Sequence, residues 1–317
     1  MSELRKDYIF DRWVIISEKR GKRPQQFSQT KLKSSNNKIE KPCVFCVGNE
    51  NLTAKEIFRI GDDKTWIIRA FRNLFPAVEP KNFTRIKTKN KLLTSTNAYG
   101  YHEIIVDSNN HSKQLHDLPA SHIKDLLVVF IQRIRGLSKD KKIKYVTIFK
   151  NHMKEAGTSI IHSHCQLLAY NEFPTKIGHE IDVFNKSKSC KFCKVIKLES
   201  KSKRLCFKNR TFMAFAPFAS QYPYEIEIMP LKHKSNILEL NESELIDLAD
   251  LIKKAIYKLS RIKAPYNLYL HNFPKNKKSH FQIKIAPRMN IQGGFELETE
   301  TIINTIFPEK AAKFYRT

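Results

Sequence analysis

The stretch Ile160–Ala169, I-I-H-S-H-C-Q-L-L-A, places His162, His164 and Gln166 at alternate positions. Alternation is the period of a β-strand, so these three side chains are predicted to leave the same face of a strand. The lead-in Asn151–Ser159 is polar and contains one glycine, which predicts a turn that can aim backbone N–H groups at an anion. The stretch therefore predicts a strand that presents chemistry to a cleft, and a strand with two solvated histidines is the alternative.

The chain has 317 residues, a length that suits two ordinary domains or one large one. Its hydrophobic content of 41% and aromatic content of 11% are typical of a folded globular protein. It contains no apolar run of about eighteen residues, so no membrane span is expected. Met1–Asp7 lacks the apolar core of a secretion signal, and we expect a cytoplasmic protein.

The net charge is +26, from 57 basic and 31 acidic residues, and a surplus of this size attracts phosphates. The lysines are scattered among asparagines, however, and do not form the compact basic block with aromatic residues that indicates a nucleic-acid surface. The charge gives weak support to an anionic substrate, and nucleic acid is not expected as a partner.

Four of the six cysteines form two C-x-x-C pairs, Cys43 with Cys46 and Cys190 with Cys193. In a chain without a secretion signal, such pairs indicate metal binding or redox chemistry rather than disulfides. The first pair lacks the strand-then-helix surroundings of a thioredoxin-like motif, which favours metal. The cysteines at positions 165 and 206 are expected to be buried as small apolar residues.

Several features occur twice in the same order along the chain. Cys190–Cys193 resembles Cys43–Cys46, and Tyr224–Ile228 resembles His102–Val106. Ser279–Ala286, S-H-F-Q-I-K-I-A, resembles the opening stretch but contains a single histidine. This order predicts two copies of one α+β unit, of which the first carries the chemistry.

The two copies predict two domains, residues 1–172 and 173–317. Apolar residues at helical spacing predict helices over Ala120–Gly136 and Glu242–Arg261, and Asn241 and Glu244 are spaced as a capping box for the second helix. Apolar strands are predicted at Trp13–Ser17, Trp66–Phe71, Tyr101–Asp107 and Lys144–Phe149.

Histidines in matching order complete each cysteine pair. The two sets are Cys43, Cys46, His111 and His162, and Cys190, Cys193, His233 and His280. Tetrahedral Zn²⁺ takes this ligand mixture, and four protein ligands leave no open position, so both metals are predicted to be structural. Iron is an alternative metal at the second site. The other interpretation is that His111 and His233 are ordinary surface histidines.

A series of motifs runs over nearly the whole chain. They are E-L-R-K-D (3–7), R-W-V-I-I-S (12–17), R-G-K-R-P (20–24), C-V-F-C-V-G-N-E (43–50), R-N-L-F-P-A (72–77), H-E-I-I-V-D (102–107), H-S-H-C-Q (162–166), P-F-A-S-Q-Y-P-Y-E (217–225) and G-G-F-E-L (293–297). With these motifs the chain resembles the galactose-1-phosphate uridylyltransferase family, the transferase branch of the histidine-triad (HIT) superfamily. The resemblance implies an α+β fold of two tandem HIT-like domains, with antiparallel half-barrel sheets and flanking helices, assembled as a homodimer.

The resemblance also implies a mechanism. His164 would attack the α-phosphorus of a nucleotide-sugar, expel the sugar 1-phosphate and form a nucleotidyl-histidine, which a second phosphorylated acceptor then attacks. Neutral imidazole is a competent nucleophile near pH 7. Gln166 stands where the hydrolase branch has a histidine. Its amide can donate a hydrogen bond to a phosphoryl oxygen but cannot act as an acid, which would protect the intermediate from water.

Matching positions imply the substrate contacts. Arg20 and Arg23 would bind phosphates, Asn73 would lie along the nucleotide, Asn151, Gly157 and Ser159 would cradle the α- and β-phosphates, and Glu296 would bind hexose hydroxyls, within the chain or across the dimer interface.

The sequence departs from the family near its C-terminus. Relatives place a glutamine shortly after G-F-E, whereas Glu298–Ile303 here reads E-T-E-T-I-I. The second C-x-x-C belongs to a two-zinc subgroup that includes enzymes acting on ADP-sugars. The expected reaction is transfer of UMP from UDP-glucose to galactose 1-phosphate, and the alternative is an ADP-glucose phosphorylase with inorganic phosphate as acceptor. A binding protein without catalysis is disfavoured because H-S-H-C-Q is intact.

Overall fold

The computed structural model describes residues 3–10, 13–16, 42–62, 65–81, 87–88, 93–95, 97–273 and 278–317. The strands of its main sheet are β3 (Glu56–Gly61), β4 (Trp66–Arg72), β7 (Gly100–Val106), β8 (Tyr145–His152), β9 (His164–Tyr170), β10 (Leu205–Lys208), β11 (Phe212–Phe215), β12 (Ile226–Pro230), β13 (Tyr266–His271) and β14 (Gln282–Pro287). The helices are α2 (Ala120–Leu137), α3 (Thr175–Asn185), α4 (Lys191–Glu199), α5 (Glu242–Arg261), α6 (Gly294–Thr299) and α7 (Pro308–Arg316). Short strands are β1 (Glu3–Lys6), β2 (Trp13–Ile16), β5 (Lys87–Thr88), β6 (Thr94–Ser95) and β15 (Ile302–Asn304).

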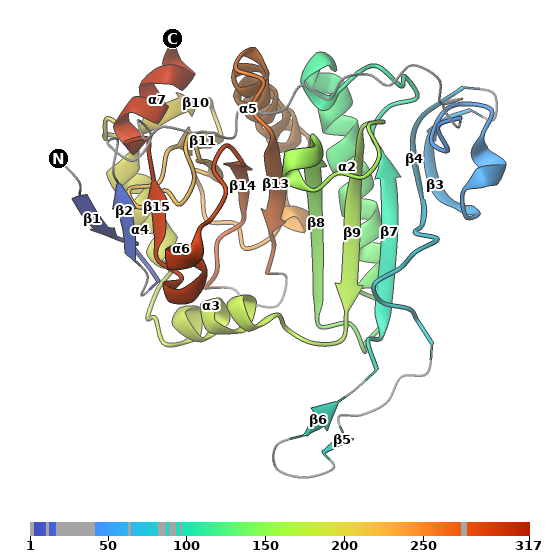
Figure 1. Cartoon of the computed structure of the whole chain (residues 1–317), viewed down its shortest axis with the longest axis horizontal. Coiled ribbons are helices and arrows are strands. Elements are labelled where there is room, and N and C mark those ends of the chain that lie inside the picture. Colours follow the sequence, from blue (N-terminus) through green and yellow to red (C-terminus); the bar gives the residue numbers. More distant parts are fainter. Residues whose placement is uncertain are drawn as a thin grey trace.

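The main sheet is antiparallel throughout its described strands, in the order β10-β11-β12-β14-β13-β8-β9-β7-β4-β3 (Figure 1). Counted outward from the centre, the two halves have matching strand orders, β8-β9-β7-β4-β3 and β13-β14-β12-β11-β10. The halves join where β8 pairs with β13 and Asn151 lies opposite Asn267. The predicted α+β pseudo-repeat is therefore confirmed, and its two half-sheets form one continuous sheet.

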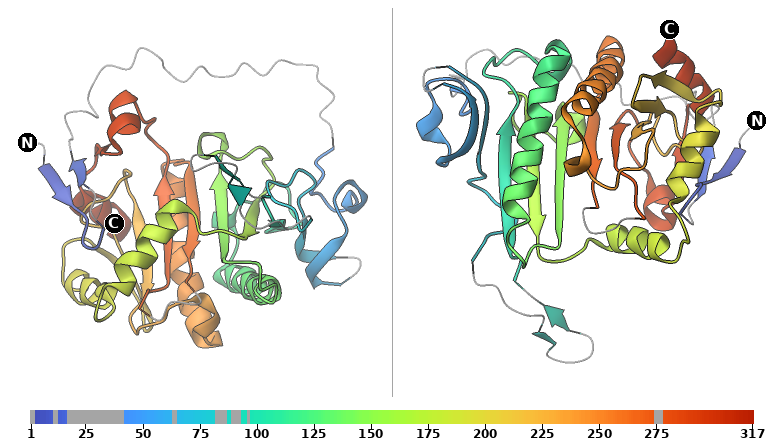
Figure 2. Two further views of the ribbon diagram at one scale, coloured as in Figure 1. Left: turned by 90° about the horizontal axis from the view of Figure 1, so that it is seen from below. Right: turned by 180° about the vertical axis from the view of Figure 1, so that it is seen from behind.

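Helices α2 and α5 pack side by side against one face of this sheet (Figure 2). Their apolar faces and strand residues such as Leu167 and Ile283 share one buried core, in which Leu248 of α5 is fully covered. The predicted capping box starts α5: the Asn241 side chain accepts the N–H of Glu244 at 3.0 Å, and the Glu244 carboxylate accepts the N–H of Asn241 at 2.9 Å. The two long helices are therefore where the apolar periodicity predicts them.

The opposite face of the sheet differs between the halves. In the C-terminal half, α3 and α4 cover it, and Phe184 and Phe192 pack in one apolar cluster with Met213 and Phe215. In the N-terminal half, no α-helix of the described residues lies over β7, β8 and β9 on this side (Figure 1). Since successive strand residues alternate between faces, the residues of β9 that point away from α2 are presented here.

The prediction that His162 shares a strand face with His164 and Gln166 is wrong. Strand β9 begins at His164, so His162 lies in the turn before it, and β14 likewise begins two residues after His280. The His162 ring turns toward the cysteines, with its Nδ1 3.6 Å from the Cys43 sulfur, and its Nε2 donates to the carbonyl of Ser108.

The first two strands form a sheet with a strand close to the C-terminus. Strand β1 pairs with β2, and β2 pairs in parallel with β15, so these segments form a small sheet of their own (Figure 1). The division into residues 1–172 and 173–317 stays a prediction. Among the described residues, no helix is both long and apolar enough to cross a membrane.

Candidate functional site

Cys43 and Cys46 lie in a turn, where histidines from two other segments meet them. The Cys46 sulfur is 3.3 Å from Nδ1 of His111 and 3.7 Å from Nδ1 of His162, which is 3.6 Å from the Cys43 sulfur. The four ligand atoms all lie within 4.8 Å of one another. Around tetrahedral Zn²⁺, sulfur and nitrogen ligands at about 2.3 and 2.0 Å are roughly 3.5 Å apart. The donor set and its spacing therefore fit zinc.

The other nitrogen of His162 holds the ring in place. Its Nε2–H donates to the carbonyl of Ser108 at 2.7 Å, which leaves Nδ1 without a proton and facing the cysteines. A metal-binding histidine commonly donates its second N–H to a carbonyl in this way. The His162 side chain is fully buried, so a metal here joins the cysteine turn to the segment that leads into β9.

The second half repeats this cluster. Cys190 precedes α4 and Cys193 lies in its first turn, and their sulfurs are 3.6 Å from His280 Nδ1 and 3.5 Å from His233 Nδ1, respectively. His280 Nε2 donates to the carbonyl of Pro230 at 3.0 Å. Both predicted four-residue groups come together in the structure as clusters that could hold a metal ion. The identity of each metal stays a prediction.

The cysteine turn also reaches the candidate nucleophile. Phe45, between the two cysteines, is buried, and its ring packs edge to face on the ring of His164 with centroids 5.3 Å apart. Phe45 belongs to a small apolar cluster with Ile104 and Val106 of β7. The cysteine turn therefore positions His164 in two ways: Phe45 packs on its ring, and the cysteines contact His162, two residues before it.

His164 is held in one tautomer. Its Nδ1 lies 2.9 Å from the carbonyl oxygen of His162, which can only accept, so Nδ1 carries the proton and Nε2 carries the lone pair. The side chain is only 6% exposed, and this burial, with the charge of Lys150, lowers the pKa of His164 below its usual range. The imidazole is consequently neutral near pH 7, as a nucleophile must be.

A buried ion pair supports the main chain at His164. The ammonium of Lys150 on β8 contacts the carboxylate of Asp107 and donates to Ser163 Oγ at 2.8 Å and to the carbonyl of His164 at 3.1 Å. Ser163 Oγ in turn donates to Asp107 at 2.8 Å. Lys150 and Asp107 are 1% and 0% exposed, and the ammonium lowers the pKa of Asp107 despite the opposing effect of burial.

We predict that Lys150→Met lowers the free energy of unfolding by about 3–5 kcal/mol, because it leaves the Asp107 carboxylate buried without its counter-ion. The measurement is the denaturation midpoint in excess Zn²⁺. The matched control, Lys150→Met with Asp107→Asn, removes the uncompensated charge and should recover part of the loss. A loss below about 1 kcal/mol in Lys150→Met would show that the pair is hydrated rather than buried.

Gln166 follows His164 by two residues on β9, so both side chains leave the same face. Gln166 is partly exposed, and its Oε1 lies 2.9 Å from Nε2 of His102 on the neighbouring β7. The site thus combines a neutral imidazole with a free Nε2 lone pair and an amide on one face. Such a pair can attack a phosphorus centre and hold a phosphoryl oxygen.

Comparisons with known proteins agree with this chemistry. The family model described as galactose-1-phosphate uridyl transferase, N-terminal domain, matches residues 1–174. A model for a domain of unknown function, DUF4921, matches residues 92–314. The ADP-glucose phosphorylase of Arabidopsis thaliana is 35% identical over 332 residues, which cover 99% of this chain and 92% of that protein. The chain belongs to the galactose-1-phosphate uridyl transferase family.

Other similar proteins also align with the whole chain or nearly all of it. The galactose-1-phosphate uridylyltransferase of Thermotoga maritima is 28% identical over 335 residues, covering 100% of this chain and 98% of that protein. A crystal structure of an ADP-glucose phosphorylase from Arabidopsis thaliana with bound ADP-glucose has a TM-score of 0.86 at 31% identity, covering 100% of this chain and 99% of that one. A uridylyltransferase structure has a TM-score of 0.76 at 25% identity, covering 100% and 97%.

Three of the residues that the family resemblance assigns to phosphate binding, Asn151, Gly157 and Ser159, lie at the end of β8 and in the turn after it. Asn151 Oδ1 accepts from Asn267 of β13 at 2.8 Å, and Gly157 has the positive φ of 94° that favours glycine. The N–H groups of Ala156, Gly157 and Thr158 donate within the turn, so they are not available to an anion. Ser159 in this turn is exposed, and the Asn151 side chain is partly exposed, with its Nδ2 3.4 Å from the carbonyl of Gly157.

The remaining assigned residues are spread more widely. Asn73 follows β4 and lies 3.2 Å from the His102 ring, close to Gln166. Glu296 is in α6, beside the C-terminal half of the sheet and away from β9 (Figure 1), where its carboxylate accepts the N–H of Gly293. Within one chain Glu296 is therefore not brought to His164. Arg20 and Arg23 lie outside the described residues.

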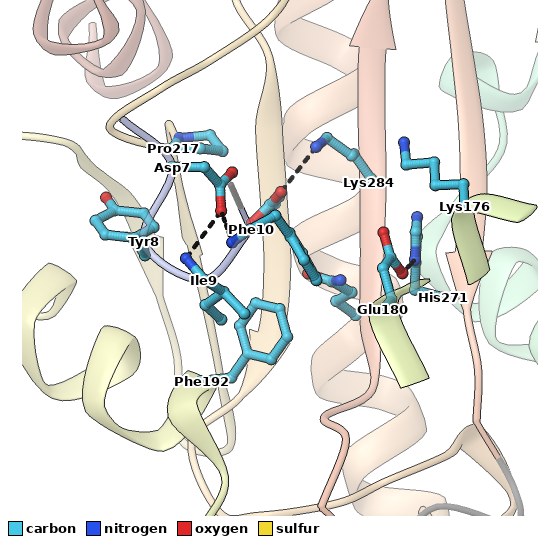
Figure 3. A pocket seen from close by; sticks show the side chains of 12 residues that line it. Asp7, Tyr8, Ile9, Phe10, Lys176, Glu180, Phe192, Pro217, His271 and Lys284 are labelled. Atoms are coloured by element: carbon cyan, nitrogen blue, oxygen red, sulfur yellow. Dashed lines mark hydrogen bonds and ion pairs between the residues drawn. The ribbon is translucent and has the colours of Figure 1, made fainter. Parts of the chain in front are cut away.

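Figure 3 shows a pocket in the second half of the molecule, lined by Gln282 and Lys284 of β14. These two residues follow the cluster histidine by two and four positions, as His164 and Gln166 do in the first half. Lys284 is ion-paired with Glu227 at 3.0 Å, and an amide replaces the imidazole. The second half thus has no nucleophile at this position.

Sequence patterns did not indicate three contacts of the site: those of Phe45, of the Lys150–Asp107 pair and of His102. The repetition of phenylalanine in both C-x-F-C turns was a usable signal for Phe45, because Phe192 lies near His280 as Phe45 lies near His162. Lys150 and His102 had no comparable signal, because lysine and histidine on strands are ordinarily solvated.

Proposed function

We propose that this protein is a nucleotidyltransferase that moves a nucleotidyl group from a nucleotide-sugar to a phosphorylated acceptor through His164. The observation that carries the proposal is the 2.9 Å contact between His164 Nδ1 and the His162 carbonyl. It leaves the lone pair on Nε2, the ring nitrogen that does not face the main chain, in a neutral and nearly buried imidazole.

In the first step, the Nε2 lone pair of His164 forms a bond to the α-phosphorus. The bond from that phosphorus to the bridging oxygen breaks, and the sugar 1-phosphate leaves with the electron pair. The ring becomes positively charged, and Nδ1 keeps its proton on the His162 carbonyl. In the second step, an acceptor phosphate oxygen attacks the same phosphorus and the P–N bond breaks, which restores neutral His164.

The metal clusters hold the site rather than react. Zn²⁺ in either cluster would have four protein ligands, so it supplies no open position for substrate. The first cluster restrains His162, whose carbonyl orients His164, and it carries Phe45 against the His164 ring. We assign zinc to both clusters, with iron as an alternative at the second.

Adenine is the better supported base. The plant ADP-glucose phosphorylase is 35% identical, against 28% for the bacterial uridylyltransferase, and its structure has the higher TM-score. The proposal is therefore that ADP-glucose donates AMP to His164 and inorganic phosphate accepts it. Transfer of UMP from UDP-glucose to galactose 1-phosphate is the second candidate, supported by the uridylyltransferases of several organisms.

The proposal includes a homodimer. Glu296 lies on α6, far from His164 of its own chain, so it can bind the hexose only if a second copy brings it there (Figure 1). Exposed apolar residues beside it, Ile291 at 96% and Leu297 at 68%, support contact with another chain. Arg20, Arg23, Asn73, Asn151 and Ser159 are assigned to the phosphates and the nucleoside, with Gly157 shaping the turn.

The test is intact-protein mass spectrometry after brief mixing with ADP-glucose and, in parallel, with UDP-glucose. An adenylyl adduct that disappears on addition of inorganic phosphate, with release of ADP, is the expected result. A uridylyl adduct that galactose 1-phosphate discharges would instead support the second candidate. The absence of any adduct with both nucleotide-sugars would overturn the proposal.

A further inference from the structure

His102 lies where it can control the Gln166 side chain. It is on β7, two residues before Ile104, which pairs directly with Gln166 of β9. His102 is therefore the diagonal neighbour of Gln166 on the same face, a distance that an imidazole can span. Its Nε2 lies 2.9 Å from Gln166 Oε1, and its Nδ1 lies 3.1 Å from the backbone nitrogen of Ala77.

Ala77 determines the tautomer of His102. A backbone N–H can only donate, so Nδ1 of His102 must accept and carry no proton. In the neutral ring the proton is then on Nε2, and it points at Gln166. Burial lowers the pKa of His102, which favours this neutral form at pH 7.

The His102 tautomer in turn determines which way the Gln166 amide faces. Because His102 Nε2 donates, the atom of Gln166 beside it must be the carbonyl oxygen. The amide of Asn73 does not compete as an acceptor: its oxygen accepts the N–H of Phe75 at 2.9 Å, so its nitrogen is the atom that faces His102. The NH₂ group of Gln166 is left with no hydrogen-bond partner among the described residues.

We propose that His102 is a positioning residue for nucleotidyl transfer, holding Gln166 with its NH₂ group turned to the phosphoryl oxygen bound at His164. The inference rests on the proposed function and specifies how the amide works in it. A glutamine that is free to rotate presents its carbonyl oxygen to the phosphoryl group part of the time, which repels instead of binding. Fixing the amide beforehand removes that wrong orientation.

Two substitutions of His102 each keep one of the two hydrogen bonds that its ring makes, to Ala77 or to Gln166. In His102→Asn, the new side-chain oxygen lies near the former Nδ1 and can still accept from Ala77, but nothing reaches Gln166. In His102→Gln, the new amide nitrogen lies near the former Nε2 and can still donate to Gln166. His179→Asn is the matched control, because His179 is exposed on α3 in the other half of the sheet.

We expect His102→Asn to slow formation of the nucleotidyl-enzyme by about 10-fold in rapid-quench measurements, since one hydrogen bond to a charged group is weakened. The KM for the nucleotide-sugar should change little, because the contact matters most in the intermediate and the transition states. His102→Gln should recover most of the rate, and His179→Asn should match the wild type. A wild-type rate in His102→Asn would overturn the inference.

A double-mutant cycle distinguishes positioning from a general structural effect. In Gln166→Ala there is no amide to orient, so adding His102→Asn should change the rate less than about 2-fold. The same 10-fold loss in both backgrounds would show that His102 acts on the fold and not through Gln166. Zinc content and the unfolding midpoint of each variant report its folding.

The tautomer of His102 can also be determined by NMR, without an activity assay. Long-range ¹H–¹⁵N NMR of the wild-type protein with ¹⁵N-labelled histidine should show His102 protonated at Nε2, with its signal identified by its loss in His102→Gln or His102→Asn. A proton on Nδ1 would overturn the inference even if the enzyme is active. If the wild type forms no adduct with either nucleotide-sugar, the proposed function fails while this measurement still tests the geometry.

Discussion

Replacing His164 with alanine is expected to abolish the nucleotidyl-enzyme adduct and to lower turnover by at least about 10⁴-fold. The alanine side chain has no nitrogen to attack the α-phosphorus. Within the described residues, the other imidazole rings near the site already contact other groups. His162 Nδ1 faces the cysteines, and His102 Nδ1 accepts from Ala77. Intact mass after mixing with ADP-glucose and UDP-glucose, together with steady-state turnover, is the measurement.

The variant must be shown to fold. His164 packs on Phe45 and its main chain is held by Lys150, and the second contact does not depend on the side chain. We therefore expect the zinc content to be unchanged and the unfolding free energy to fall by less than about 3 kcal/mol. Gln166→Ala is the matched control on the same strand face: it keeps the nucleophile, so it should still form the adduct, more slowly. An adduct in His164→Ala would place the nucleophile elsewhere.

Loss of the first metal cluster is expected to have the second largest effect. Cys43→Ser removes one of four ligands, so the protein should bind one zinc in place of two and lose more than about 3 kcal/mol of unfolding free energy. Adduct formation should also slow, because the same turn holds His162 and Phe45 beside His164. Metal analysis, denaturation midpoints and the adduct rate are measured on the same sample.

Cys190→Ser is the matched control for that effect. It breaks the equivalent cluster of the other half, where Cys190 lies 3.6 Å from His280 and no nucleophile follows on β14. It should lose one zinc and some stability but keep most of the adduct rate. Two zinc ions per chain in Cys43→Ser would show that the first cluster is misassigned. An equal loss of rate in both variants would show that the metals act only through overall stability.

Much of the site could be predicted because it depends on local patterns. The alternation of His164 and Gln166 follows from the period of a strand, and it holds in β9. The two Cys₂His₂ sets follow from ligand chemistry and from their repeated order, and both sets come together. The capping box of α5 lies within four residues, so it needs no tertiary contact to form.

The orientation of the reacting groups depends on contacts between distant segments. His102 and Gln166 are 64 residues apart and meet through the register of the neighbouring strands β7 and β9. Lys150 of β8 and Asp107, which follows β7, are 43 residues apart and meet at the end of β9, the strand between β8 and β7. His162 has strand spacing in the sequence but lies in a turn, because its ring contacts Cys43 and the carbonyl of Ser108. The local sequence pattern therefore identifies the imidazole of His164 and the amide of Gln166 as the reacting groups. The His162 carbonyl, in the turn that the tertiary contacts shape, leaves the lone pair of His164 on Nε2, and the pairing of β7 with β9 decides which atom of the Gln166 amide faces the substrate, because hydrogen-bond direction is set by the partner that the fold supplies.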